Sequence, residues 1–259
     1  MKTAVCLYGL FTHHFPDSGE MGHEHIKERI LKKVPDADFF CHSWDVNKTQ
    51  LITDWYQPKK WVIEPQIDFS EKVNAIDLER YLYSPYRDWQ YLFRAFSFYY
   101  TRAKAIELKK EYEKENNFKY DCVIDSRFDL AWNNPIDFSN YNMDNFYIPT
   151  VQKDGRWYGW PHTDQHEIMD FVFFSNSDNM NDFSPLIYDM LGEYNKTIYQ
   201  WKGMSAHFVC FAHLVNLKLL PDKCRVGLKI ATPNGDGKMK DDDHCQLIRR
   251  EYFGETLRR

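Results

Sequence analysis

The chain has 259 residues, a length that fits one large domain with a sizeable core. Its 33 basic and 38 acidic residues give a formal charge of −5, which indicates neither nucleic acid nor an anionic membrane surface as a partner. No apolar run approaches the roughly 18 residues of a membrane span, and the short apolar start is not typical of a signal peptide. We therefore expect a cytoplasmic protein without a transmembrane segment.

The first half of the chain alternates between strand and helix patterns. An apolar run at 3–9 ends at Gly9 and predicts a strand, and a helical pattern follows from about 21 to 33. Two more strand patterns lie at 37–44 and 60–64. This spacing is typical of an α/β domain.

The longest predicted helix begins after Asp88. Apolar residues recur there every three or four positions, and the segment 107–115 is charged, so the helix is amphipathic. It leads directly into the apolar strand pattern of 120–130. We expect the helix to cover one face of a sheet in which this strand is central. The apolar stripe consists of Trp89, Leu92, Phe93, Phe96, Tyr99, Tyr100, Ala103 and Ile106.

The rest of the chain carries weaker patterns. The predicted elements are strands at 146–148 and 170–175 and helices at 178–195 and 203–220. The loop at 155–161 is rich in aromatic residues, which suit either the stacking of a sugar ring or core packing. Because no repeat or linker interrupts the chain, we predict a single domain over 1–259, with 221–259 as an irregular C-terminal extension.

The six cysteines form no CxxC pair, which favours reduced and buried thiols. No GxxxxGK[ST] motif and no GxSxG motif is present, so a P-loop kinase and a serine hydrolase of that type are not indicated. His23 and His25 are two residues apart on a predicted helix. They point to different faces and are poorly placed to share a metal ion.

The most informative stretch places Asp125, Arg127 and Asp129 at every second position of a predicted strand. Side chains with this spacing lie on one face of an extended strand. Carboxylates suit a divalent cation that also holds a diphosphate, and the arginine suits a phosphate oxygen. An internal Asp–Arg ion pair at the end of a strand explains the same residues. The three residues alone leave both interpretations open.

Two acids late in the chain are candidate general bases for a hydroxyl group. Asp170 precedes the predicted strand at 170–175, and Asp164 lies just before it. For Asp170, capping of neighbouring backbone amides is the structural alternative.

Several segments, in their order, resemble glycosyltransferases of the GT-A fold from bacterial surface-polysaccharide loci and large DNA viruses. The resemblance covers roughly the first 220 residues. Two features depart from the family pattern: Leu10 stands where many members have an arginine, and Asp125-x-Arg127-x-Asp129 replaces DxD. The segments that carry the resemblance are 5–9, 39–45, 59–64, 105–110, 120–130 and 170–175.

The resemblance implies a GT-A-like (Rossmann-like) α/β fold with a mixed, mostly parallel sheet flanked by helices. It implies that Asp125 and Asp129 hold Mn²⁺ or Mg²⁺, with His244 as a C-terminal ligand. The alternative for His244, and the one that its run of three aspartates favours, is an ordinary acidic tail. Further candidate contacts of the nucleotide are Gly9, Asp45, Arg94, Ser97 and Arg127.

The implied function is the metal-dependent transfer of a hexosyl or pentosyl group from a nucleotide diphosphate sugar, first of all a UDP sugar, to a glycan acceptor. With Asp170 or Asp164 as a base, the reaction would invert the anomeric centre. The implied compartment is the bacterial or host-cell cytosol. Two alternatives remain: a non-catalytic protein that binds a nucleotide sugar or carbohydrate, and a metal-dependent phosphohydrolase. Nothing in the sequence indicates the oligomeric state.

Overall fold

The structure is a computed structural model that describes residues 1–12, 17–77, 88–153, 156–158, 168–189, 191, 206–231 and 245–247. The strands are β1 (Thr3–Gly9), β2 (Asp38–Ser43), β3 (Lys60–Ile63), β4 (Cys122–Arg127), β5 (Leu130–Trp132), β6 (Phe146–Lys153), β7 (Arg156–Tyr158), β8 (Val172–Ser175), β9 (Cys224–Ala231) and β10 (Cys245–Leu247). The helices are α1 (Ser18–His25), α2 (Thr49–Tyr56), α3 (Ser70–Asn74), α4 (Trp89–Asn116), α5 (Ser177–Asp189) and α7 (Ala206–Asn216).

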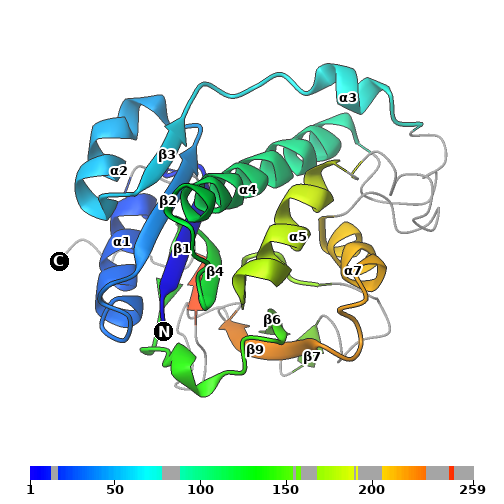
Figure 1. Ribbon diagram of the computed structural model, residues 1–259. Coiled ribbons are helices and arrows are strands. Elements are labelled where there is room, and N and C mark those ends of the chain that lie inside the picture. Colours follow the sequence, from blue (N-terminus) through cyan, green and yellow to red (C-terminus); the bar gives the residue numbers. More distant parts are fainter. Residues whose placement is uncertain are drawn as a thin grey trace.

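These strands form one mixed sheet in the order β3-β2-β1-β4-β8-β6-β9-β10-β5, with β7 beside β6. The first four strands of this order are parallel, and β8 is antiparallel to β4. The register places Cys6 opposite Asp125 and Tyr8 opposite Arg127. The prediction of an α/β fold with a mixed, mostly parallel sheet flanked by helices is confirmed (Figure 1).

The two faces of the sheet carry separate apolar layers. In β1, Cys6 and Tyr8 belong to the apolar layer formed with α4. Val5 and Leu7 belong to the layer on the opposite face of the sheet, which also contains Phe11. Helices α4 and α5 lie along the first face, and α1 and α2 lie apart from them in Figure 1. This alternation follows from the period of two in a strand whose two faces are both covered.

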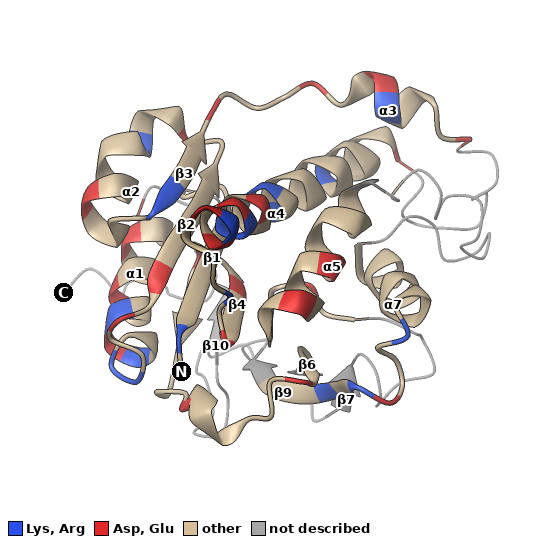
Figure 2. Cartoon of the chain, in the orientation of Figure 1, with Lys and Arg blue, Asp and Glu red and all other residues tan. Residues whose placement is uncertain are grey.

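Helix α4 confirms the predicted amphipathic helix and is the longest described element, at 28 residues. Its N-cap, Asp88, accepts hydrogen bonds from the backbone N–H groups of Gln90 and Tyr91. It ends where Asn117 adopts a left-handed conformation. Charged residues of both signs gather at the C-terminal end of α4 (Figure 2), where Lys60 of β3 contacts Glu111 and Glu115.

Two elements early in the chain differ from the predictions. The helix expected over 21–33 begins earlier, as α1, and continues through a π-helical segment at Ile26–Ile30. Helix α2 was not predicted, although Ile52 and Tyr56 lie four residues apart and are both buried. A run of eight residues is too short for its helical period to stand out against a strand pattern.

The expectation of an irregular extension over 221–259 needs correction. Strand β9 lies in this segment and pairs with β6 in parallel, and β10 continues the sheet to β5. The signal was present, since Val226, Leu228 and Ile230 alternate with polar residues or glycine, as in a strand. Strand β6 also extends beyond the predicted 146–148 to Lys153 because β9 pairs with it along its length.

The five cysteines whose side chains the structure describes are free and buried, as the prediction of reduced thiols requires. Burial raises the pKa of these thiols, so they remain protonated at neutral pH. The buried free cysteines are Cys6, Cys41, Cys122, Cys210 and Cys224. In the part of the chain that the structure describes, no helix is both long and apolar enough to cross a bilayer.

Helix α1 approaches the turn after β4 at one glycine. A Cβ atom built on Gly22 would lie 1.8 Å from the carbonyl oxygen of Phe128. Only a residue without a side chain allows this contact of backbone with backbone. Gly22 therefore determines how closely α1 supports the turn that contains Asp129.

We predict that Gly22→Ala lowers the free energy of unfolding by about 2–3 kcal/mol, because the added methyl group forces α1 away from the turn. Glu24→Ala, at an exposed position of the same helix, is the control and should change it by less than about 0.5 kcal/mol. Urea denaturation followed by circular dichroism measures both values. Equal stability of the two variants would contradict the close approach.

Candidate functional site

A pocket of about 410 Å³ opens at the carboxyl ends of β1, β2 and β4. Strands β2 and β3 lie on one side of β1 and β4 lies on the other, so the order of the parallel strands reverses between β1 and β4. Ligands of open α/β sheets bind at such a reversal point. The lining residues are Tyr8, Gly9, Leu10, Trp44, Gln66, Tyr91, Phe93, Arg94, Ala95, Ser97, Phe98, Thr101, Arg127, Asp170 and Ala206.

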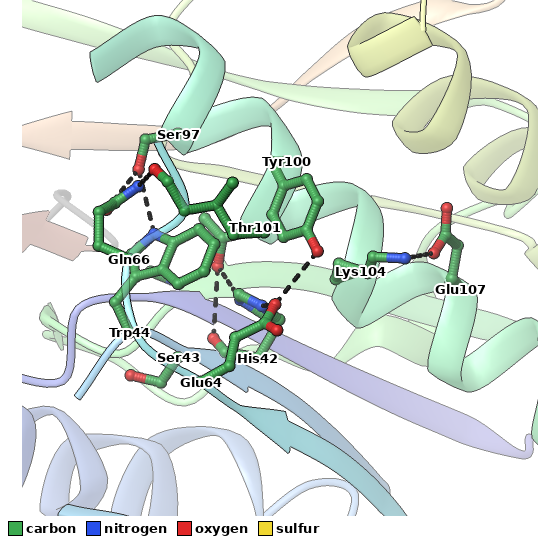
Figure 3. A network of polar contacts seen from close by, with 12 residues as sticks. His42, Ser43, Trp44, Glu64, Gln66, Ser97, Tyr100, Thr101, Lys104 and Glu107 are labelled. Carbon is green, nitrogen blue, oxygen red and sulfur yellow. Dashed lines mark hydrogen bonds and ion pairs between the residues drawn. The ribbon is translucent and has the colours of Figure 1, made fainter. Parts of the chain in front are cut away.

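Helix α4 supplies one side of the pocket. Arg94, Ser97, Phe98 and Thr101 follow each other at intervals of three, one and three residues, so they lie on one face of the helix. Ser97 accepts a hydrogen bond from Trp44 Nε1 at 3.0 Å and donates one to Gln66 Oε1 at 3.0 Å (Figure 3). The first turns of α4 are thereby joined to the segments that follow β2 and β3.

Gly9 ends β1 at the pocket with a φ of 98°, and no atom lies within 4 Å of a Cβ built there. Its N–H donates to Thr101 Oγ1 at 2.9 Å. The backbone at this point can thus approach a ligand closely.

Beneath Gly9, a hydrogen-bond chain runs from Thr101 through His42 to Glu64 (Figure 3). Burial lowers the pKa of His42, although the hydrogen bond to Glu64 raises it, so the imidazole is neutral. Its Nε2–H then donates to Glu64 Oε1 at 3.0 Å, and its Nδ1 accepts from the Thr101 hydroxyl at 2.5 Å. This chain holds α4 against the ends of β1 and β2.

Arg102, one residue further along α4, is fully buried. Its guanidinium group lies against the rings of Tyr8 and Phe173, with Cζ 4.7 and 4.5 Å from their centroids. One Nη donates to the Tyr8 hydroxyl at 2.5 Å and to the carbonyl oxygen of Asp170 at 2.8 Å. The Tyr8 hydroxyl also donates to that carbonyl, at 3.1 Å. Arg102 therefore links α4 to β1 and to the segment before β8.

Asp125 is the counter-ion of Arg102. Its Oδ2 lies 2.7 Å from Arg102 Nε, and both side chains have no exposed surface. The contact is an ion pair without good hydrogen-bond alignment, and neither Asp125 oxygen accepts an aligned bond from a described residue. Burial raises the pKa of Asp125 to about 7, although Arg102 lowers it. Asp125 does share one face of β4 with Arg127, as the alternation indicated, but it lies beneath the pocket and does not line it.

Arg127 and Asp129 form a second ion pair at the end of β4. Arg127 Nε and one Nη each donate to a different oxygen of Asp129 at 2.7 Å, which is the bidentate geometry typical of arginine and carboxylate. Asp129 lies in the turn after β4 and not in the strand, which ends at Arg127. Its side chain is 1% exposed, whereas that of Arg127 is 15% exposed and lines the pocket.

These two ion pairs do not fit the metal site that the resemblance implies. Each proposed carboxylate ligand contacts a guanidinium group, and a cation would have to displace both. The described residues include no group of three histidine, cysteine or acidic side chains that could hold a metal ion. His244 and Asp164 lie outside the described residues. The geometry of Asp125 and Asp129 is that of the internal Asp–Arg pair that the sequence left as the alternative.

Of the residues that the structure describes, Asp170 is the one carboxylate that lines the pocket. Its side chain is nearly buried, and Oδ1 lies 3.7 Å from His207 Nδ1. The nearby Ile168 carbonyl, which can only accept, lies 3.0 Å from the same nitrogen, so Nδ1 carries a proton. The hydrogen bonds that the side chains of Tyr8 and Arg102 donate to the Asp170 carbonyl oxygen hold Asp170 in this position.

The other predicted site residues are divided between the pocket and its surroundings. Arg94 lines the pocket, is exposed, and forms no hydrogen bond or ion pair with another described residue. Asp45 does not line it. Its Oδ2 accepts from the Thr12 backbone N–H at 2.7 Å and from the Thr12 hydroxyl at 3.0 Å, and thus holds the loop after β1. In the aromatic segment 155–161, only the backbone of β7 is described.

His23 and His25 contact different parts of the protein, as their spacing predicts. His23 stacks on Trp55, with ring centroids 4.7 Å apart, and His25 Nδ1 lies 2.9 Å from the Trp132 carbonyl oxygen. They share no ion site.

The sequence analysis missed Tyr8, His42, Thr101 and Arg102. Thr101 and Arg102 lie four and five residues after Ser97 on the predicted helix but outside its apolar stripe, so no local signal marked them as buried. Both side chains are buried in the fold, where polar groups need partners. The identity of those partners depends on β1, β2 and β4, and no local pattern reveals it.

A family model described as a domain of unknown function (DUF7796) matches residues 1–159. Mouse xyloside xylosyltransferase 1 is similar in structure, with 11% sequence identity, a TM-score of 0.46, and coverage of 87% of this chain and 84% of that chain. A nucleoside-diphosphate-sugar pyrophosphorylase from Vibrio cholerae is similar with 11% identity and a TM-score of 0.44, over 89% and 92% of the two chains. At these scores neither likeness bears on the function of the pocket. No curated protein sequence matches the chain.

We predict that Arg102→Met destabilises the protein more at high pH than at low pH. Burial raises the pKa of Asp125 in the fold to about 7, above its value in the unfolded chain, so ionisation of this carboxyl costs stability as the pH rises from about 4 through about 7. Without Arg102 the ionised form has no counter-ion. We expect a loss of about 3–5 kcal/mol at pH 9 and a smaller loss at pH 5.

Denaturant titrations at several pH values measure this effect. The double variant Arg102→Met/Asp125→Leu is the control, because it removes the titrating group and should abolish the pH dependence of the loss. A loss by Arg102→Met that is independent of pH would show that Asp125 is not coupled to Arg102.

Proposed function

We propose that this chain, which belongs to the family described as a domain of unknown function (DUF7796), binds a nucleotide diphosphate sugar in the pocket between β1 and β4 and transfers the sugar to a glycan acceptor. The observation that carries the proposal is the position of the pocket where the order of the parallel strands reverses. The resemblance of the sequence to GT-A glycosyltransferases supports the same class of ligand.

The lining of the pocket suits such a donor. Trp44, Phe93 and Phe98 offer apolar ring faces, against which a nucleobase or a sugar ring packs well. Arg94 and Arg127 offer guanidinium groups for phosphate oxygens. The open backbone at Gly9 leaves room for a group that approaches the end of β1. A UDP sugar is the first donor to test.

Asp170 is the proposed general base. Its carboxylate would accept the proton of an acceptor hydroxyl while that oxygen forms the bond to the anomeric carbon and the bond to the diphosphate breaks. The negative charge then resides on the released nucleoside diphosphate. Attack from the side opposite the leaving group would invert the anomeric centre. Transfer of a hexosyl or a pentosyl group fits this scheme equally.

A metal ion has no step in this scheme, because the described carboxylates at the end of β4 contact guanidinium groups. The same geometry gives no support to the metal-dependent phosphohydrolase. A non-catalytic protein that binds the same donor differs from the proposed transferase only in its lack of turnover.

We predict that a UDP or GDP sugar raises the melting temperature of the protein, because a ligand selective for the native state stabilises it. A panel of both series, measured by differential scanning fluorimetry at donor concentrations up to several millimolar, tests this. If no donor shifts the melting temperature, the proposed function is wrong.

Asp170→Asn is expected to retain the donor-induced shift and to lose turnover by roughly 10²–10⁴-fold, because the amide cannot accept the proton. Release of nucleoside diphosphate in the presence of a glycan acceptor measures turnover. Asp54→Asn, at an exposed position of α2, is the matched control and should leave both quantities unchanged. Full turnover by Asp170→Asn would remove Asp170 from the mechanism, and a wild type that binds donors without turnover would favour the non-catalytic alternative.

A further inference from the structure

The ion pair at the end of β4 presents its arginine, and not its carboxylate, to the pocket. Arg127 lines the pocket with 15% of its side chain exposed, and Asp129 is 1% exposed and does not line it. A ligand in the pocket therefore meets the guanidinium group first. In a metal-dependent site, by contrast, two carboxylates would point toward the ligand and hold it through a metal ion.

Asp129 also determines how the guanidinium group is oriented. The two hydrogen bonds at 2.7 Å occupy Nε and one Nη of Arg127. The other Nη, with two N–H groups, donates to no residue that the structure describes. A planar group held on one edge keeps its remaining donors in a fixed direction, which lowers the entropy lost when a ligand binds.

A second guanidinium group faces the same pocket. Arg94 lies on the pocket face of α4 and is exposed, and no described residue forms a hydrogen bond or an ion pair with it. Among the described residues that line the pocket, the charged side chains are therefore two arginines and the carboxylate of Asp170. The net charge of these three side chains is positive, although the formal charge of the protein is −5. A positive net charge in the pocket favours an anionic ligand group.

A metal ion bound by Asp125 and Asp129 would oppose this arrangement. It would separate Asp129 from Arg127 and Asp125 from Arg102, and Arg102 is fully buried between Tyr8 and Phe173. A buried guanidinium group without a counter-ion is strongly unfavourable. The existing pairs thus protect both carboxylates from a cation.

We propose that the pocket binds the phosphate groups of its ligand through Arg127 and Arg94 without a metal ion, and that Asp129 is a positioning residue for Arg127 and not a metal ligand. The proposal rests on the proposed function, since it concerns the same pocket. In it, guanidinium groups compensate the negative charge of the leaving diphosphate.

Isothermal titration calorimetry with uridine, UDP, guanosine, GDP and inorganic pyrophosphate, in EDTA and again with Mn²⁺, tests the proposal. We expect a diphosphate to bind in EDTA more tightly than its nucleoside. Arg127→Gln and Arg94→Gln should each weaken diphosphate binding by roughly ten-fold or more and leave nucleoside binding nearly unchanged, because charge-assisted hydrogen bonds to phosphate are lost. Arg29→Gln, outside the pocket, is the control for the loss of one positive charge.

The variant Asp129→Asn tests whether Asp129 positions Arg127 or only stabilises the fold. The variant should weaken UDP or GDP binding in EDTA but not the binding of the nucleoside, and Asp129→Glu should restore part of the loss. Equal losses for nucleoside and diphosphate would indicate a structural defect and would overturn the positioning role.

The outcomes for this proposal and for the proposed function differ. Diphosphate binding that requires Mn²⁺ and disappears in Asp129→Asn would overturn the proposal and leave the proposed function standing. Pyrophosphate binding in EDTA that depends on Arg127, with no binding of any nucleotide, would support the proposal and overturn the nucleotide-sugar donor. No binding by any of the five probes would overturn both.

Discussion

The burial of Arg102 is the constraint on which the rest of the site depends. A guanidinium group cannot lose its charge inside a protein, so every element around it must supply an anion, an acceptor or an aromatic face. Asp125 supplies the charge, the Tyr8 hydroxyl and the Asp170 carbonyl oxygen supply acceptors, and Phe173 supplies a ring face. These contacts join α4, β1, β4 and the segment before β8, which are the elements that surround the pocket.

The sequence predicted the elements with long or strongly alternating patterns. Helix α4 and strands β1 and β8 appear within a few residues of the expected positions, because their burial imposes a period that the apolar residues reveal. The short helix α2 was missed because a run of eight residues offers little period. Strand β9 was missed although the alternation of its apolar residues is visible in the sequence. Which strands become neighbours was not accessible from local patterns, and the antiparallel pairing of β4 with β8 is an example.

In the candidate site, too, the sequence predicted which side chains share a face of a strand but not which side chains they contact. The alternation in β4 correctly placed Asp125 and Arg127 on one face, but it could not reveal that Asp125 meets an arginine from α4. A pattern of charges in a strand fits a metal site and an ion pair equally well. The distinction depends on which side chain arrives from another element. That side chain is Arg102, which lies outside the apolar stripe predicted for α4, so the helix pattern gave no sign of its burial.

Helix α4 supplies Arg94, Ser97 and Thr101 to the pocket and Arg102 to the core below it, all from one continuous segment with no break in its hydrogen bonding. One residue added or removed between Ser97 and Thr101 would rotate every later side chain by about 100°. The binding face and the buried cation would then point in different directions. Length variation among relatives of this chain should accordingly be excluded from the interior of α4, and insertions should be confined to the segments outside it.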